Sequence, residues 1–199
     1  MTRTFIALEM NDGLQRQLVE VIRQLALNLP DVRWVDPAGI HLTLAFLGEL
    51  DDEQLRAAIQ ASVSVAQNAQ PFHYTLTRLG IFGQLHQPRV IWMGIEEPTS
   101  ALSRLHHALN QELAQRGFEL DSRPFSPHLT LARIKAPLSP KEQNYLQKML
   151  AGDQLSLVST EVYPVTSMQV MKSELSPAAA RYTSMRTCKF GEKQKNASV

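Results

Sequence analysis

The pentapeptide HLTLA occupies residues 41–45 and occurs again, letter for letter, at residues 128–132. In each copy a histidine and a threonine lie two positions apart among apolar residues. Residues i and i+2 of a β-strand point to the same face, so each pair should share a polar face while the leucines point into the core. The sequence therefore predicts two half-buried strands that carry four polar side chains: His41, Thr43, His128 and Thr130.

The segments around the two copies recur in the same order. The 87-residue shift that carries His41 to His128 also carries Phe5 to Trp92. A chance five-letter identity in a chain of this length has a probability on the order of one in a hundred. Strand, helix, strand, helix and strand are expected twice, which predicts an α+β protein of two similar lobes. A pseudo-two-fold axis between the lobes would bring the two motifs face to face across a cleft.

Hydrophobic spacing and capping residues predict the elements. Helices are expected over 11–30, from about 52, over 99–116 and from Ser139. Strands are expected over 4–9, 72–82, 89–96, 155–163, 166–174 and 181–190. Asp12 and Gln15 form a candidate capping box for the first helix, which should end at Pro30. The last helix should begin at Ser139, with Pro140 and Glu142 in its first turn. We expect one bilobal domain over 1–190, an internal repeat at about 4–82 and 89–175, and a polar, disordered tail over 191–199.

Composition narrows the class of protein. The formal net charge is +1, so no strong global field draws the chain to nucleic acid or membrane, although a local basic groove could still bind a polyanion. Hydrophobic residues make up 44% of the chain, which is ordinary for a protein with a buried core. A single cysteine, Cys188, allows no intrachain disulfide and no multi-cysteine metal site. The first residues lack the long apolar run of a signal peptide, and no run approaches a membrane span. We expect a soluble, cytoplasmic protein.

A histidine beside a threonine suits an anionic oxygen ligand. Histidine can gain or lose a proton near neutral pH, and a threonine hydroxyl can donate to a phosphoryl oxygen. Two facing pairs suit in-line displacement at phosphorus, in which one imidazole takes a proton from the nucleophile and the other gives one to the leaving oxygen. The histidine spacing matches no zinc motif, so we expect no metal. A lone histidine on a strand is more often structural, but two identical copies at matching positions favour a two-part site.

These motifs resemble the paired H-x-T motifs of the two-histidine (2H) phosphoesterases, and most closely those of the bacterial RNA 2′,3′-cyclic phosphodiesterases, also called 2′-5′ RNA ligases. The resemblance extends to FIALEM, VRWVDPAGIHLTLAFLGEL and the late SELSPAAARYTSMRTCKF, and covers about residues 3–190. SPAAARYT lacks the glycine expected after the proline, which concerns the shape of a loop.

The resemblance implies a bilobal α+β fold with antiparallel-rich sheets, outer helices and a cleft that holds both histidines. It implies opening of terminal 2′,3′-cyclic phosphates of RNA, half-tRNAs among them, to 2′-phosphomonoesters, without metal or cofactor. The same chemistry in reverse would join RNA ends by a 2′-5′ bond without ATP. We expect His41 to be the proton donor and His128 the proton acceptor, with Thr43 and Thr130 holding the phosphate, in a monomer.

By resemblance, Phe46 and Arg133 flank the terminal base or phosphate, and Tyr182 could stack there. Strict strand alternation places Phe46 and Arg133 on the leucine face instead, unless the strands twist or bulge. Arg123 and Lys172 could supply positive charge for RNA, although each is individually more typical of a solvated surface residue, and Trp34 could stack a base, although a core tryptophan is more typical. Two other functions stay open: a phosphodiesterase for a small cyclic nucleotide such as ADP-ribose cyclic phosphate, and a non-catalytic module that binds RNA ends.

Overall fold

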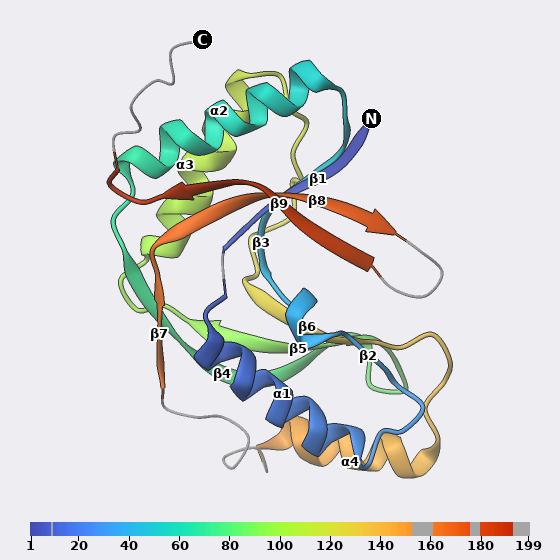
Figure 1. Ribbon diagram of the computed structural model, residues 1–199. Helices are drawn as coiled ribbons and strands as arrows, with labels where there is room; N and C mark the ends of the chain where they lie inside the picture. The colour runs from blue at the N-terminus through green and yellow to red at the C-terminus, as the bar shows by residue number, and fades with distance from the viewer. Residues whose placement is uncertain (9, 153–160, 176–179, 193–199) are drawn as a thin grey trace.

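The computed structural model describes residues 1–8, 10–152, 161–175 and 180–192, and the described strands form two antiparallel sheets (Figure 1). One sheet has the order β3-β1-β8-β9 and the other the order β2-β6-β5-β4-β7. In chain order the strands are β1 (Thr2–Leu8), β2 (Arg33–Trp34), β3 (Leu42–Leu50), β4 (Phe72–Gln84), β5 (Gln87–Glu96), β6 (His128–Arg133), β7 (Val162–Val165), β8 (Ser167–Leu175) and β9 (Ala180–Lys189). The α+β class and the antiparallel sheets predicted from the sequence are confirmed.

Four α-helices and one short 3₁₀ helix connect the described strands. They are α1 (Asp12–Ala26), η1 (Pro37–Gly39), α2 (Asp52–Asn68), α3 (Ala101–Gln115) and α4 (Pro140–Ala151). The predicted capping box at Ser139 and Glu142 is confirmed. The prediction for the first helix was wrong at both ends: Asn11 caps it by accepting from the backbone of Leu14, and the helix ends at Ala26, before Pro30. Asparagine is as good a cap as aspartate, so composition alone could not separate the two neighbours.

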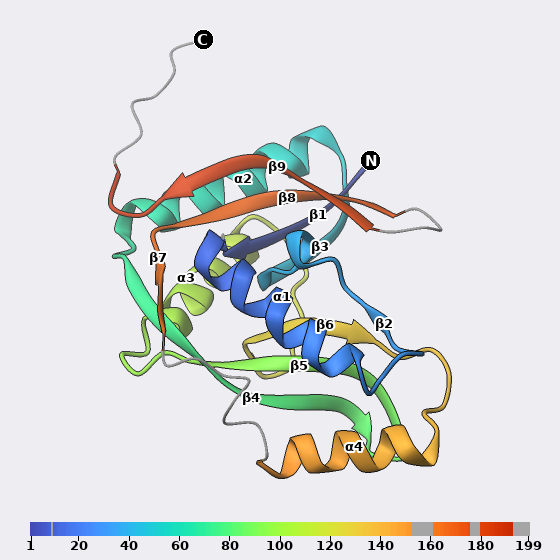
Figure 2. The same ribbon diagram turned by 60° about the horizontal axis from the view of Figure 1, so that its bottom comes forward.

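Each of the two sequence repeats contributes strands to both sheets. β4, which closes the first repeat, pairs with β5 of the second repeat, while β8 pairs with β1. The helices α2 and α3 pack together over the first sheet, whereas α1 and α4 lie on the side of the second sheet (Figure 2). Each sheet therefore combines strands from both halves of the chain.

The two motif strands share an irregularity. In β3 the partners of Ile6 and Ala7 are Ala45 and Thr43, so the intervening residue, Leu44, opposes nothing in β1. In β6 the same skip passes over Leu131, the residue that the 87-residue shift makes equivalent to Leu44. Each strand thus has a β-bulge at the fourth letter of HLTLA, after which its side-chain alternation is reversed.

The partner strands are less alike than the motifs. Thr43 lies opposite Ala7, but Thr130 lies opposite Trp92 and not opposite Gly94, which the 87-residue shift makes the counterpart of Ala7. The correspondence of Phe5 with Trp92 in sequence is therefore displaced by two positions in space. A displacement by two residues keeps every side chain on its own face, so the face containing the motif residues is preserved.

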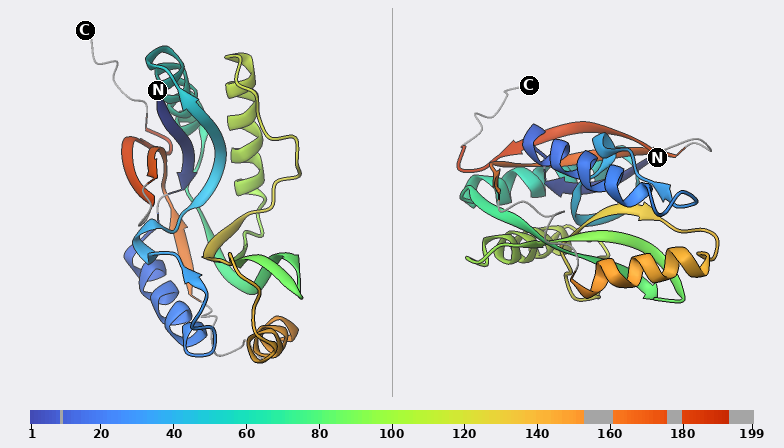
Figure 3. Two further views of the ribbon diagram at one scale, coloured as in Figure 1. Left: turned by 90° about the vertical axis from the view of Figure 1, so that its right-hand side faces the viewer. Right: turned by 90° about the horizontal axis from the view of Figure 1, so that it is seen from below.

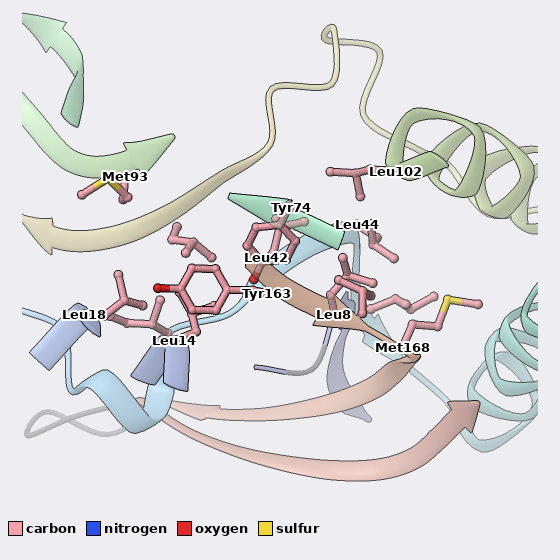
Figure 4. Close-up of a cluster of buried hydrophobic side chains, with 14 of the residues drawn as sticks. Leu8, Leu14, Leu18, Leu42, Leu44, Tyr74, Met93, Leu102, Tyr163 and Met168 are labelled. Atoms are coloured by element: carbon pink, nitrogen blue, oxygen red, sulfur yellow. The ribbon is translucent and has the colours of Figure 1, made fainter. Parts of the chain in front are cut away.

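One hydrophobic core runs through both sheets. Leu42 and Leu44 of the first motif and Leu129 and Leu131 of the second are all buried in it, as the sequence predicts. Figure 4 shows how leucines from β1, β3 and α1 surround the rings of Tyr74 and Tyr163, whose centroids lie 6.0 Å apart. This core fixes the leucine faces of both motif strands and leaves the opposite faces for polar side chains.

Candidate functional site

The two motif histidines are held in the same way. The Nδ1 atom of His41 lies 2.9 Å from the carbonyl oxygen of Gly39, and the Nδ1 atom of His128 lies 2.7 Å from that of Ser126. A carbonyl oxygen can only accept, so Nδ1 carries the proton in both rings and Nε2 is the atom that gains or loses one. The two motifs therefore share the tautomer as well as the sequence, because each histidine bonds through Nδ1 to the carbonyl two residues before it and keeps Nε2 for proton transfer.

Different local structures position the two carbonyls. Gly39 ends the 3₁₀ helix η1, whose N-cap Asp36 accepts from the backbone of Ala38. Ser126 follows Phe125, whose ring stacks on His106 of α3 at 3.8 Å between centroids and 9° between planes. No sequence pattern predicts these contacts, because any residue can present a carbonyl and only the turn decides where it points.

The motif strands β3 and β6 lie next to each other (Figure 3), and a hydrogen bond from Val35 to the carbonyl of Leu131 joins the segment before the first motif to the second. His41, Thr43, His128 and Thr130 are all half-buried, whereas the leucines between them are buried. We refer to the four polar residues as the motif surface.

Aromatic rings enclose His41. Its imidazole stacks on Phe5, with centroids 4.5 Å apart, and meets the ring of Tyr182 edge-on at 4.8 Å. Phe5 also contacts Phe46 at 6.1 Å and is itself almost fully buried beneath these rings. Tyr182 thus lies beside His41 and packs against the histidine.

A second aromatic group lies beside His128. Phe82 meets its imidazole edge-on at 4.8 Å, and Trp92 lies at 6.1 Å. Neither residue was predicted as part of the site. The signal was weak, because Phe82 lies in β4, which is separated from the motif strand β6 by β5, and no local pattern in the sequence reveals that neighbourhood.

The surroundings of His41 favour its neutral form in the free protein. Burial lowers the pKa of His41, and the positive charge of Arg133 lowers it further, while the hydrogen bond to Gly39 opposes both effects. Arg133 ends the second motif strand, and β3 and β6 are in contact, so a charge on one motif strand acts on the histidine beside the other.

The bulges resolve the conflict over Phe46 and Arg133. Both residues follow a buried pair, Leu44–Ala45 or Leu131–Ala132, and both are exposed. Because the bulge reverses the alternation, the residue five positions after each histidine returns to the histidine face. Phe46 has 68% of its surface exposed, so a role in core packing is excluded.

Three further residues considered from the sequence have local partners. Arg123 forms an ion pair with Asp121, and Lys172 forms one with Glu174 at 2.8 Å. The indole nitrogen of Trp34 donates to the carbonyl of Leu29 and the ring packs against the core. These contacts account for all three residues without RNA.

Three further observations concern a pocket, metal ligands and membrane-spanning helices. A hollow of about 860 Å³ lies between α2, α3 and β4, but none of the four motif residues lines it. No group of three or more His, Cys, Asp or Glu side chains suited to a metal ion occurs within the described ranges. Among the helices of those ranges, none is long and apolar enough to cross a bilayer.

Comparison with known proteins agrees with this geometry. Residues 12–185 match the model of the 2′-5′ RNA ligase superfamily. The chain is 29% identical over 188 residues to an RNA 2′,3′-cyclic phosphodiesterase of Thermotoga maritima, covering 94% of this chain and 95% of the relative. It is 35% identical over 133 residues to the Escherichia coli protein of that name, covering 66% of this chain and 71% of the relative.

Solved structures show the same fold. A crystal structure of a Thermus thermophilus protein matches with a TM-score of 0.79 at 25% identity, covering 96% of this chain and all of that one. E. coli LigT complexed with 3′-AMP matches with a TM-score of 0.71 at 25% identity, covering 96% of this chain and 99% of that one. With the duplicated histidine geometry and a family match over most of its length, the chain belongs to the 2′-5′ RNA ligase superfamily of two-histidine phosphoesterases.

Proposed function

We propose that the protein is an RNA 2′,3′-cyclic phosphodiesterase that opens the terminal cyclic phosphate to a 2′-phosphomonoester. The observation that carries the proposal is the matched pair of Nδ1 hydrogen bonds, which leaves one Nε2 in each motif for proton transfer. The relatives named RNA 2′,3′-cyclic phosphodiesterase support the choice of substrate.

The reaction needs two proton transfers. Water attacks phosphorus and loses a proton to Nε2 of His128, the bond from phosphorus to the 3′-oxygen breaks, and Nε2 of His41 gives its proton to that oxygen. The products are a 2′-phosphate and a free 3′-hydroxyl. General acid and base catalysis of this kind contributes roughly 10²–10⁴ in rate for each group.

The role of His41 as donor requires it to be protonated in the complex, although its surroundings lower its pKa in the free protein. The anionic phosphate supplies the compensation, because an opposite charge within about 4–6 Å favours the charged imidazole. Substrate binding and protonation of His41 are therefore coupled.

The remaining residues bind and orient the substrate. The hydroxyls of Thr43 and Thr130 donate to the non-bridging oxygens, and Arg133 offsets the negative charge. Phe46, exposed beside the ring that supports His41, offers a surface on which the terminal base stacks, and Tyr182 packs edge-on against both His41 and Phe5.

Several finer properties belong to the same proposal. The enzyme is a cytoplasmic monomer without metal or cofactor, and its substrates are RNAs with cyclic-phosphate ends, tRNA fragments among them. When an RNA 5′-hydroxyl replaces water as the nucleophile, the same opening of the cyclic phosphate joins two ends by a 2′-5′ bond, and the reverse of that step cleaves the bond. Hydrolysis dominates because water greatly outnumbers 5′-hydroxyl ends.

The test is mass spectrometry of the product from an oligoribonucleotide that ends in a 2′,3′-cyclic phosphate. We expect a gain of one water and a phosphate at the 2′-position. His41→Ala and His128→Ala should abolish the product, and His107→Ala, an exposed histidine of α3, is the matched control. Unchanged substrate with the wild-type protein, or full activity of the double variant, would refute the proposal.

A further inference from the structure

We propose that Phe82 is the stacking surface for a second nucleobase, that of the nucleoside which carries the 5′-oxygen of a 2′-5′ linkage. The inference rests on the proposed function, because it assigns a second substrate group to the same site. It concerns the joining of RNA ends and its reversal, whereas opening of a cyclic phosphate by water needs only one nucleoside.

The exposure of aromatic side chains points to this role. Among the Phe, Tyr and Trp side chains that the structure describes, two are exposed: Phe46, with 68% of its surface accessible, and Phe82, with 36%. One lies beside each motif histidine, because Phe46 contacts the ring under His41 and Phe82 contacts His128 directly. An apolar ring that faces water is stabilised when a base covers it, by about 1–3 kcal/mol for each stacked base.

The strand register places Phe82 on the motif surface. Phe82 lies opposite Val90, and Val90 lies opposite Arg133, so the three share one row of the second sheet. The next row on the same face holds Gly80, Trp92 and Thr130. Phe82 therefore shares a face with Trp92 and Thr130, and its ring contacts that of His128.

Two arginines lie at the other end of the row that contains Phe82. Arg33 of β2 lies directly opposite Arg133, and both side chains are exposed. A phosphodiester backbone over this row would be attracted by both guanidinium groups. An aromatic ring at one end and two guanidinium groups at the other fit a single-stranded nucleic acid.

The chemistry decides which nucleoside lies on Phe82. In a 2′-5′ linkage two nucleosides flank one phosphorus, one through its 2′-oxygen and the other through its 5′-oxygen. On joining, His128 takes the proton of the attacking 5′-hydroxyl while His41 protonates the departing 3′-oxygen. The nucleoside with the 5′-oxygen thus lies on the side of His128, where Phe82 is, and the nucleoside with the cyclic phosphate lies on the side of Phe46.

Three substrates test the assignment with wild type, Phe82→Leu and Phe82→Trp. They are a mononucleoside 2′,3′-cyclic phosphate, a dinucleotide that ends in a 2′,3′-cyclic phosphate, and a 2′-5′-linked dinucleoside monophosphate. For Phe82→Leu we expect kcat/KM on the 2′-5′-linked substrate to fall by about 5- to 150-fold more than on the mononucleoside substrate, chiefly through KM. Phe82→Trp should restore it, and Phe46→Leu, the matched control, should weaken all three substrates.

Each other outcome overturns a defined part of the reasoning. An equal loss on all three substrates, seen in kcat, would mean that Phe82 only positions His128. A selective loss on the cyclic-phosphate dinucleotide would assign the ring to the upstream nucleoside instead. A wild-type protein that opens cyclic phosphates but neither cleaves nor forms a 2′-5′ bond would sink the inference and leave the proposed function standing, whereas no turnover of any substrate would sink the proposed function itself.

Discussion

Adding a single methyl group at Gly80 should displace the ring of Trp92, which lies beside the second motif. Gly80 lies opposite Trp92 across β4 and β5, and Trp92 lies opposite Thr130 of the second motif. A Cβ atom at Gly80 would lie closer than 3.0 Å to three atoms of the indole ring, Cζ2, Cη2 and Cε2. Ordinary contact begins at 3.4 Å, so the ring cannot stay where it is.

The size of the effect follows from the stiffness of the indole. Three contacts on one flat ring cannot be relieved by a small torsion, so Gly80→Ala forces either the strands apart or the ring toward Phe82 and His128. Overpacking of this kind costs about 1–3 kcal/mol. For a chain of this length that lowers Tm by roughly 2–12 °C. Displacement of reacting groups by about 1 Å can cost up to about a hundredfold in rate, so we expect kcat/KM to fall by about ten- to a hundredfold.

The assay combines thermal unfolding with hydrolysis of a 2′,3′-cyclic-phosphate oligonucleotide. Gly13→Ala in α1 is the control, because a Cβ there meets only the ends of two side chains, Glu161 at 3.1 Å and Asn11 at 3.3 Å, before contact becomes ordinary. In a double-mutant cycle with Trp92→Leu, the cost of Gly80→Ala should shrink, since the ring that it strikes is gone. A Gly80→Ala protein as stable and as active as wild type would contradict the packing that we describe around the second motif.

Three further predictions concern the histidines and their surroundings. His41→Ala and His128→Ala should each lower kcat by roughly 10²–10⁴. The double variant should lose little more than the worse single variant, because the two histidines act as a unit. Single-turnover rates measure this, and fully additive losses would contradict it. Arg133→Gln removes a positive charge that lowers the pKa of His41, so that pKa should rise. If His41 is the proton donor, the alkaline limb of the kcat/KM–pH profile should then move to higher pH. Arg133→Lys, which keeps the charge, should leave that limb in place. Movement of the acidic limb instead would show that His41 is the base. Activity should survive EDTA at full rate in a discontinuous product assay, and a loss that zinc or magnesium restores would refute the metal-free mechanism.

The sequence was enough to predict the motif strands and most of the elements around them, whereas β2 and η1 were not predicted and most of the expected strand over 155–163 lies outside the described residues. Alternation of polar and apolar residues in HLTLA is a local property, and so is the capping box at Ser139, and both are confirmed. What could not be predicted depends on distant segments. Phe82 and Trp92 reach His128 through the strand pairings of β4, β5 and β6. Hydrophobic periodicity does not show that β4 pairs with β5 or that β8 pairs with β1, because each pair joins strands from different repeats.

The histidine tautomers lie between these two cases. Nothing in the letters before the motifs marks Gly39 and Ser126 as equivalent, because one ends a 3₁₀ helix and the other follows an extended loop. Their common feature is a backbone carbonyl two residues before a histidine, and every residue has a carbonyl. A duplicated site can therefore keep its geometry while the residues that supply it diverge, provided that the backbone returns to the same point.

The bulge shows why the repeated word has five letters. A strand that alternated strictly through HLTLA would send the residue after it to the leucine face, and Phe46 and Arg133 would then be buried. The doublet Leu-Ala breaks the alternation in both copies: Leu44 and Ala45, like Leu131 and Ala132, are adjacent and both buried. The histidine and threonine begin the polar face, the doublet holds the bulge in the core, and the next residue returns to the polar face. Because the skip occurs at the same letter in both strands, the bulge is part of what was duplicated, and it brings an aromatic ring on one side and a guanidinium group on the other to the histidine face.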